Sequence, residues 1–275
     1  MKVYIGVDME GVAGISHPAP TRHGEEGFAA AAALMTGETN AAIEGAFRGG
    51  ATAVLVNDGH GRMLNLSPDA LDSRATLLQG QKVWSAMEGG GPDRGHDVAL
   101  FIGYHARAGA PRATISHTYS ENVVSSRLNN RAVGETGLHA AVLGDWGVPV
   151  ALVAGDDVVV EEARGWLPWA EGVVVKQAFG RHAAASIHPS VAREKIMSVS
   201  ERAVRRASAG EMAVLKLEGP ILLELEYRHP GQADYAAFVP GVARVGDLGV
   251  RIEADNMINA YRSFLCGIRL ASLVT

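Results

Sequence analysis

The strongest constraint on the fold is a set of four short apolar runs that each stop abruptly at polar residues. They cover Lys2 to Val7, Thr52 to Val56, Asp97 to Gly103 and Pro149 to Ala154. Apolar runs without polar alternation are typical of strands buried on both faces, and such strands form parallel sheets that helices cover. Helical stretches separate some of the runs. We therefore predict an α/β fold with a layered, mostly parallel sheet and flanking helices.

The later part of the chain has a different sequence pattern. An amphipathic helix rich in arginine and lysine is expected over Ser190 to Ala209, and short strands and a helix follow it around Ile221 to Tyr227, Gln232 to Phe238 and Val250 to Glu253. A hairpin is predicted earlier, over 123–133, with a tight turn at Asn129-Asn130. We expect residues 1–178 with 255–275 to form the main α/β domain, and residues 179–254 to form a smaller α+β domain.

Two further local features carry expectations. The alanine-rich stretch from Glu25 to Arg48 is predicted to be helical, with a break near Thr36-Gly37. The stretch Gly89 to Pro92 is expected to be a loop, since glycine and proline disfavour both helix and strand interiors.

Charge and cysteine content exclude several classes of protein. Among 275 residues, 30 are acidic and 25 basic, and this balance argues against nucleic acid as the main partner. No apolar run approaches the roughly 18 residues of a membrane span. The single cysteine, Cys266, cannot form an internal disulfide, and it is expected to be buried on an apolar helical face. A cytoplasmic globular protein is predicted.

Metal-binding residue types follow three of the predicted strands. Asp8 and Glu10 follow the first strand, Asp58 and His60 the second, and His105 the third. Ligands of open α/β sheets bind outside the carboxyl ends of the strands, so these side chains are expected to meet there. Asp8 and Glu10 converge only if the chain bends directly after the first strand.

Oxygen and imidazole ligands together suit Zn²⁺, and less specifically Mn²⁺, Co²⁺ or Fe²⁺. With Glu135, the set Asp8, Glu10, His60, His105 and Glu135 has five members, enough for two ions if one carboxylate bridges them. The alternative is that the carboxylates cap helices or pair with Arg22 and Arg107. No HExxH motif and no cysteine pair supports the metal interpretation independently.

His117, in the segment Ile115-Ser116-His117-Thr118, is the candidate catalytic base or nucleophile. The alternative is an exposed loop histidine without a role. His139 follows Glu135 by one turn and is expected to support it, while His17 and His23 lie in a proline-containing loop that is either a lid or solvated. The absence of GxSxG, GxxxxGK[ST] and GxGxxG argues against a serine nucleophile and a nucleotide-binding loop.

Several dispersed motifs resemble the bacterial zinc-dependent D-aminopeptidase family, the type found with dipeptide-transport genes. The matching segments are VDMEGVAG (7–14), VLVNDGHGRM (54–63), FIGYHARAG (101–109), ISH (115–117), NNRAVGETGLHA (129–140), VAGDD (153–157), VKQ (175–177) and GQAD (231–234). They keep the family's order over most of the chain, whereas the segments 16–24 and 181–218 look divergent.

This resemblance implies two zinc ions per subunit. Asp8 would bridge them, Glu10 and His105 would complete one ion, and His60 and Glu135 the other. His117 matches the family's nucleophile or base. The resemblance also implies a main α/β domain with a smaller second domain, and a self-compartmentalising homodecamer whose internal chamber admits small peptides.

The expected activity is release of N-terminal D-amino acids from short D-peptides by metal-activated water. A carboxylate such as Asp58 or Asp156 is a candidate to recognise the free amine. Two alternatives stay open: a dinuclear metallohydrolase for an L-peptide, another amide or a phosphoester, and a non-catalytic peptide-binding scaffold.

Overall fold

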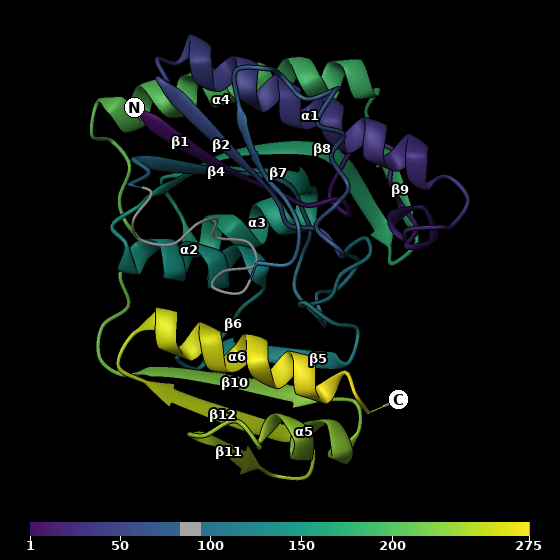
Figure 1. The fold of residues 1–275 in the computed structure, drawn as a ribbon, viewed down its shortest axis with the longest axis vertical. Helices are drawn as coiled ribbons and strands as arrows, with labels where there is room; N and C mark the ends of the chain where they lie inside the picture. The colour runs from purple at the N-terminus through teal and green to yellow at the C-terminus, as the bar shows by residue number, and fades with distance from the viewer. Residues whose placement is uncertain (83–94, 275) are drawn as a thin grey trace.

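The computed structural model describes residues 1–82 and 95–274 (Figure 1). The stretch Gly89 to Pro92, expected to be a loop, lies outside them. The larger of two sheets has the strand order β3-β2-β1-β4-β7-β8-β9, and all of its neighbouring pairs are parallel except β8 with β9. Its strands are β1 (Lys2–Val7), β2 (Ala53–Asp58), β3 (Thr76–Leu78), β4 (Val98–Tyr104), β7 (Val150–Asp156), β8 (Glu171–Gly180) and β9 (Ala183–Ser186). The predicted mostly parallel sheet is confirmed.

Helices cover both faces of this sheet, as Figure 1 shows. On one face lie α1 (Phe28–Arg48) and α4 (Pro189–Ser208), and on the other lie α2 (Glu135–Asp145) and α3 (Asp157–Trp166). Successive strand residues point to opposite faces. Val3 and Ile5 accordingly pack in the core under α1 and α4, whereas Tyr4 packs in the core shared with α2 and α3. Because both faces are buried, the strands read as uninterrupted apolar runs.

Helix α1 is continuous, so the break expected near Thr36-Gly37 was wrong. Thr36 stays helical, with its hydroxyl donating to the carbonyl of Ala32. Gly37 lies beside α4, where an added Cβ would be 3.1 Å from Nε of Arg193. The small residue therefore serves the close packing of α1 on α4 and does not end the helix.

The smaller sheet is antiparallel, with the strand order β11-β12-β10-β5-β6. Its elements are β5 (Val123–Leu128), β6 (Arg131–Ala132), β10 (Ile221–Tyr227), α5 (Pro230–Ala236), β11 (Val242–Val245), β12 (Gly249–Ala254) and α6 (Met257–Ala271). The predicted β5–β6 hairpin is confirmed, and Asn129 and Asn130 both have positive φ, as a two-residue type I′ turn requires. A short 3₁₀ helix, η1 (Ala19–Thr21), lies in the loop after β1.

The two sheets do not coincide with the predicted ranges 1–178 with 255–275, and 179–254. Strand β9 pairs with β8 of the larger sheet, and α4 packs on α1. Strands β5 and β6 join the smaller sheet through β10, and α6 packs on α5 and β12 while also contacting α2. The strands and helices that belong to each sheet are therefore not the ones that the predicted ranges group together. Independent folding of either range stays a prediction.

Within residues 1–82 and 95–274, no helix combines the length and the apolar character needed to cross a membrane.

Candidate active site

The predicted cluster forms where β1, β2 and β4 end and where α2 begins. These ends bring together Asp8, Glu10, His60, His105 and Glu135, which are almost completely inaccessible to solvent except for the 11% exposed side chain of His60. The parallel strands share one edge, which explains why residues distant in sequence meet there.

The bend after β1 depends on a close approach of two backbones. The amide of Gly11 donates to the carbonyl of Gly103 at 2.8 Å, and a Cβ at Gly11 would lie 1.9 Å from the carbonyl oxygen of Tyr104. Only glycine fits this contact. Met9 points into the core, so Asp8 and Glu10 on either side of it face the site.

His60 is oriented by a backbone carbonyl. Its Nε2 lies 2.7 Å from the carbonyl oxygen of Thr21, to which it must donate, because a carbonyl only accepts. Its Nδ1 therefore faces the carboxylates, at 3.1 Å from Oδ1 of Asp8 and 3.0 Å from Oε2 of Glu10. The loop after β2 is fixed by the carboxylate of Asp58, which accepts the amides of Asn65 and Leu66.

His105 is held in the same manner. Its Nδ1 donates to the carbonyl of Ala106 at 3.0 Å, and its Nε2 points at Oδ2 of Asp8 (3.4 Å) and Oε1 of Glu135 (3.2 Å). Glu135 is the first residue of α2, where the helix dipole favours a carboxylate, and its Oε1 accepts the amide of Tyr119 at 2.8 Å. Asp8 is thus the group whose two oxygens face both imidazoles.

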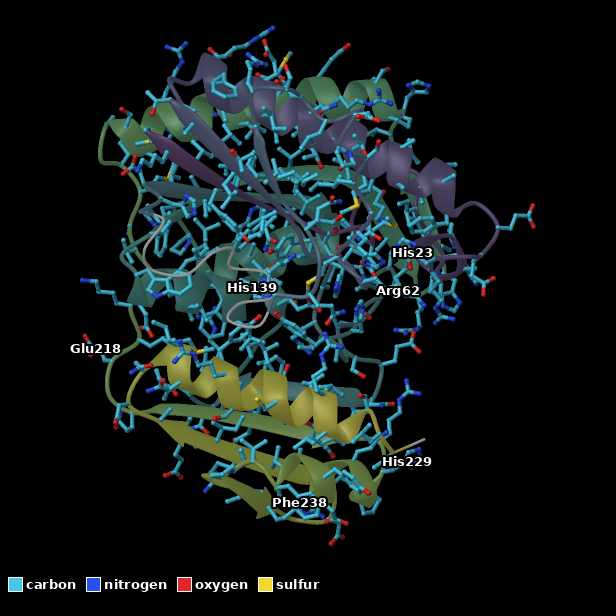
Figure 2. All side chains as sticks on the ribbon, in the orientation of Figure 1. His23, Arg62, His139, Glu218, His229 and Phe238 are labelled. Atoms are coloured by element: carbon cyan, nitrogen blue, oxygen red, sulfur yellow. The ribbon has the colours of Figure 1, made fainter. Side chains whose placement is uncertain are left out.

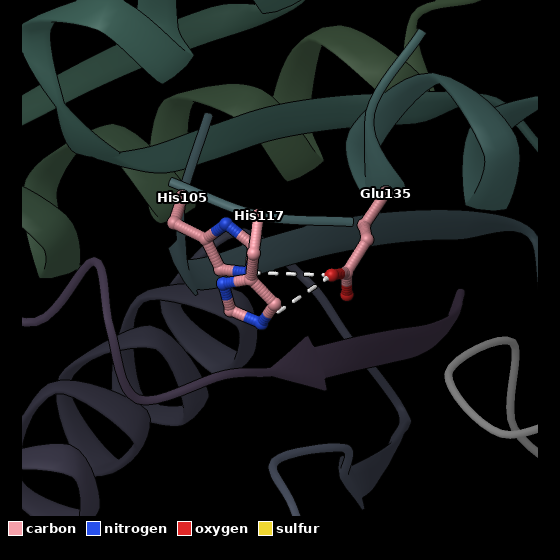
Figure 3. A group of neighbouring side chains, drawn as sticks. All are labelled: His105, His117 and Glu135. Carbon is pink, nitrogen blue, oxygen red and sulfur yellow. Dashed lines mark ion pairs between the residues drawn. The ribbon is translucent and has the colours of Figure 1, made fainter. Parts of the chain in front are cut away.

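His117 lies against His105, with parallel rings whose centroids are 4.0 Å apart (Figure 3). Its Nδ1 donates to the carbonyl of Ile115 at 2.9 Å, which leaves Nε2 directed at Oε1 of Glu135, 3.9 Å away. The side chain is 19% exposed, more than those of the other histidines and carboxylates in the cluster. Of this group, it is therefore the one best placed to reach a molecule in the pocket.

The electrostatics of the cluster are strongly coupled. Burial and the nearby charge of Glu10 raise the pKa of Asp8 to about 7. Burial alone would lower the pKa of His105, but Glu135 and Asp8 raise it to about 10. The pKa of His117 is lowered, first by burial and then by the charge on His105. Three buried carboxylates therefore depend on positive charge placed between them.

The donor set fits zinc. Oε2 of Glu10 and Nε2 of His105 are buried and face oppositely charged members of the cluster. Ligand atoms of Asp8, Glu10 and His105 lie within 4.8 Å of one another. Metal-binding histidines usually donate their second ring nitrogen to a carbonyl or carboxylate, as His60 and His105 do. Such a set of imidazoles and carboxylates is typical of zinc sites.

The cluster lies in a pocket of about 430 Å³. Its floor includes Asp8, Glu10, His60, His117 and Glu135. Its walls come from the loop that contains η1, the loop after β2, the segment 119–121 and helix α6, and they comprise Pro18, Thr21, Arg22, His23, Arg62, Met63, Tyr119, Ser120, Glu121, Leu265, Ile268 and Arg269, among others. The pocket is thus lined both by loops at the edge of the larger sheet and by α6, which packs on α5 and β12.

Several other candidates have structural roles. The carboxylate of Asp156 accepts the amides of Thr114 and Val159, and Asp58 holds its own loop. Neither lines the pocket, so the expectation that either binds the substrate amine was wrong. Cys266 is exposed, contrary to the predicted burial, because it lies on the outer side of α6.

The structure also shows whether Asp8 and Glu10 pair with arginines and where His17 and His23 lie. Arg22 lies near Glu121, and the Arg107 guanidinium donates to the carbonyl of Ala108. The ion pairs of Asp8 and Glu10 among the described residues are with histidines instead. His23 lines the pocket, whereas the ring of His17 packs against that of His182.

His139 supports the site indirectly. It lies between the larger sheet and α6 (Figure 2), completely buried, with its ring nitrogens bonded to the hydroxyls of Tyr104 and Tyr119. Burial lowers its pKa to about 3. Tyr119, which sequence reasoning missed, thereby connects His139 to Glu135. Its positive φ of 60° gives no signal in the sequence.

Similarity to known proteins identifies the family of this chain. The family model described as D-aminopeptidase, Peptidase_M55, matches residues 1–266. The D-aminopeptidase of Bacillus subtilis (strain 168) is 36% identical over 273 residues, with 98% of each chain covered. A solved structure described as the Zn-dependent D-aminopeptidase DppA from Bacillus subtilis, a self-compartmentalizing protease, superposes with a TM-score of 0.91 at 35% identity, covering 100% of this chain and 99% of that one. The resemblance seen in the motifs is confirmed, and the chain belongs to the Peptidase_M55 family of D-aminopeptidases.

Proposed function

We propose that this protein is a dinuclear zinc aminopeptidase that releases N-terminal D-amino acids from short D-peptides. The observation that carries the proposal is the convergence of three buried carboxylates and two imidazoles, each imidazole held by a backbone carbonyl, at a pocket that all of them except His105 line. A protein without chemistry at this pocket would have no reason to keep so many desolvated ionisable groups together.

Five residues would hold the two ions. Asp8 is the bridging ligand in this proposal, because its two oxygens face His60 and His105 respectively. Ligand atoms of Asp8, Glu10 and His105 lie close together, as a shared ion requires. The division of the remaining ligands, Glu10 and His105 for one ion and His60 and Glu135 for the other, is the one that the family resemblance implies. When bound, paired zinc ions activate water and polarise the carbonyl of the bond to be cleaved.

His117 is proposed as the catalytic base or nucleophile. Because its Nδ1–H donates to the carbonyl of Ile115, the lone pair of the neutral ring lies on Nε2, on the side of Glu135 and the pocket. Burial and the neighbouring His105 lower the pKa of His117, which favours the neutral ring. Nε2 is therefore able to accept a proton from an attacking group and to return it to the leaving amine.

The pocket suits a small, doubly charged substrate. Its volume of about 430 Å³ falls within the range of small-molecule sites, about 300–1,000 Å³. Outside the proposed ligands its walls carry both signs of charge, from Arg22, Arg62, Arg269 and Glu121. A short peptide with a free amine and a free carboxylate matches these charges better than an uncharged amide does.

Assembly into a homo-oligomer is part of the proposal, with the decamer as the number that the family resemblance implies. Large apolar side chains are exposed on both units. Phe179 on β8 is 66% exposed, and Phe238, at the outer end of the smaller unit in Figure 2, is 71% exposed. Light scattering after size-exclusion chromatography measures the subunit number. A cytoplasmic location stays a prediction.

Metal stoichiometry combined with substrate profiling tests the proposed function. The protein is loaded with zinc, freed of excess metal and analysed for zinc per chain, and it is then offered a D-dipeptide, an L-dipeptide, a simple amide and a phosphoester. Two zinc ions per chain and turnover of the D-dipeptide are expected. A chain that binds no zinc, or that prefers the phosphoester, would contradict the proposal.

A further inference from the structure

The segment that follows β1, residues 10–15, is fixed by two buried charged side chains that do not line the pocket. Lys176, on β8, extends under this segment, and its Nζ donates to the carbonyls of Glu10, Val12 (3.1 Å) and Ile15 (2.5 Å). One ammonium group therefore holds three backbone carbonyls, and the first belongs to a proposed zinc ligand.

A second buried side chain holds the same segment. Glu38, in the middle of α1, accepts the amide of Ala13 through Oε1 at 2.9 Å. The next amide, that of Gly14, donates to Oγ of Ser186 on β9 at 3.0 Å. The carbonyls of this segment thus accept from the Lys176 ammonium group, and the amide of Ala13 donates to the Glu38 carboxyl group. We call Lys176 and Glu38 the loop clamp.

The burial of these two groups needs a reason. Lys176 and Glu38 are each 1% exposed, and an ammonium or a carboxylate removed from water is costly unless it is paired. Lys176 uses all three of its donors on backbone carbonyls, and the charges of Asp156, Glu38 and Glu10 act on it favourably. An apolar residue would make strand β8 easier to bury, yet it would leave the three carbonyls without their buried donor.

We propose that Lys176 and Glu38 are positioning residues that hold residues 10–15 so that the Glu10 carboxylate stays at the metal site. The inference rests on the proposed zinc centre. It goes beyond the ligand set because neither residue lines the pocket and neither offers an atom to a metal in the arrangement described. Glu10 lies three residues beyond the end of β1, where no strand pairing among the described residues fixes the backbone, and the loop clamp supplies hydrogen bonds in place of that pairing.

Zinc affinity measured by competition with a chromophoric chelator tests the clamp without relying on catalysis. In Lys176→Met, one of the two zinc ions is expected to bind about 10- to 100-fold more weakly, which is the usual cost of removing a group that orients a ligand. Ile196→Ala is the matched control. Ile196 is a fully buried residue of α4, so its truncation destabilises the protein without removing any of the hydrogen bonds that Lys176 and Glu38 make to residues 10–15.

A second pair of variants keeps the proposal testable if Lys176→Met does not fold. Glu38→Leu removes the acceptor of the Ala13 amide and is expected to weaken the same zinc ion. Glu38→Gln retains an acceptor oxygen and is expected to restore most of that affinity. A structural role alone would weaken zinc binding in Ile196→Ala as much as in the clamp variants.

The outcomes separate the clamp from the function on which it rests. Wild-type zinc affinity in both Lys176→Met and Glu38→Leu would overturn the clamp and leave the zinc peptidase intact. Equal weakening in Ile196→Ala at equal stability would overturn it as well. A wild-type protein that binds no zinc would contradict the proposed function itself.

Discussion

Glu38→Gln is expected to change how the stability of the zinc-free protein depends on pH. Glu38 is buried with one oxygen lacking a hydrogen-bond partner among the described residues, and burial raises its pKa from 4.5 to about 7. The folded state therefore binds a proton more tightly than the unfolded state does. This contribution to stability is fully present below pH 4.5 and is lost as the pH rises through 7.

The magnitude follows from the size of the shift. A rise from 4.5 to about 7 corresponds to a free energy on the order of 3 kcal/mol, of which about 2 kcal/mol falls between pH 5 and pH 7.5. Glutamine at position 38 is neutral throughout and keeps an acceptor for the amide of Ala13. The variant should therefore gain about 2 kcal/mol relative to the wild type over this interval.

Urea unfolding of the chelator-treated wild type and variant, at constant ionic strength from pH 5 to pH 7.5, measures this difference. Subtracting the two curves removes the titration of the metal-site residues, which both proteins share. Glu26→Gln, at an exposed position, is the matched control and should give a flat difference. A flat difference for Glu38→Gln too would refute the reasoning that burial makes the Glu38 carboxylate costly.

Three other predictions concern the metal centre directly. Asp8→Ala removes the proposed bridging ligand and should eliminate tight zinc binding and peptidase activity together, as metal analysis and a peptide assay on one preparation would show. His117→Ala should retain both zinc ions and lose about 10²- to 10⁴-fold in kcat, because it removes proton transfer and no ligand; loss of zinc in this variant would make His117 a ligand instead. Chelation of the wild type should lower Tm by roughly 5–10 °C relative to protein in zinc at about 100 times its Kd, and an unchanged Tm in a thermal scan would contradict zinc binding to the native state.

The main features of the fold were readable from sequence for a definite physical reason. Strands buried on both faces cannot alternate apolar with polar residues, so β1, β4 and β7 stand out as uninterrupted apolar runs. Their carboxyl ends share one edge of the sheet, and this places Asp8 and His105 together without knowledge of any distance.

The division into units was not readable because it depends on pairing between distant segments. The hairpin β5–β6 looks like a local feature of the first half, yet its partner β10 lies about a hundred residues further along the chain. Helix α6 likewise carries no sequence signal that it would line the pocket, since Leu265 and Ile268 look like ordinary core residues.

The sequence around Lys176 contains a signal for its buried role, but that signal has two interpretations. A single lysine after the apolar run 173–175 indicates either the end of a strand or a buried cation with partners. Only the backbone of residues 10–15, whose carbonyls the fold brings to Nζ of Lys176, decides between the two. The roles of Asp58 and Asp156 were misjudged for a related reason, because backbone amides that satisfy a carboxylate leave no trace in sequence.

Cleavage of matched D-Ala-D-Ala and L-Ala-L-Ala by the zinc-loaded protein, each with a chelated control, decides whether this pocket is a zinc-dependent and D-specific peptidase site. We expect cleavage of the D-peptide alone, abolished by the chelator and restored by zinc. Cleavage of the L-peptide at an equal rate, or cleavage of the D-peptide that persists after zinc is removed, would contradict it.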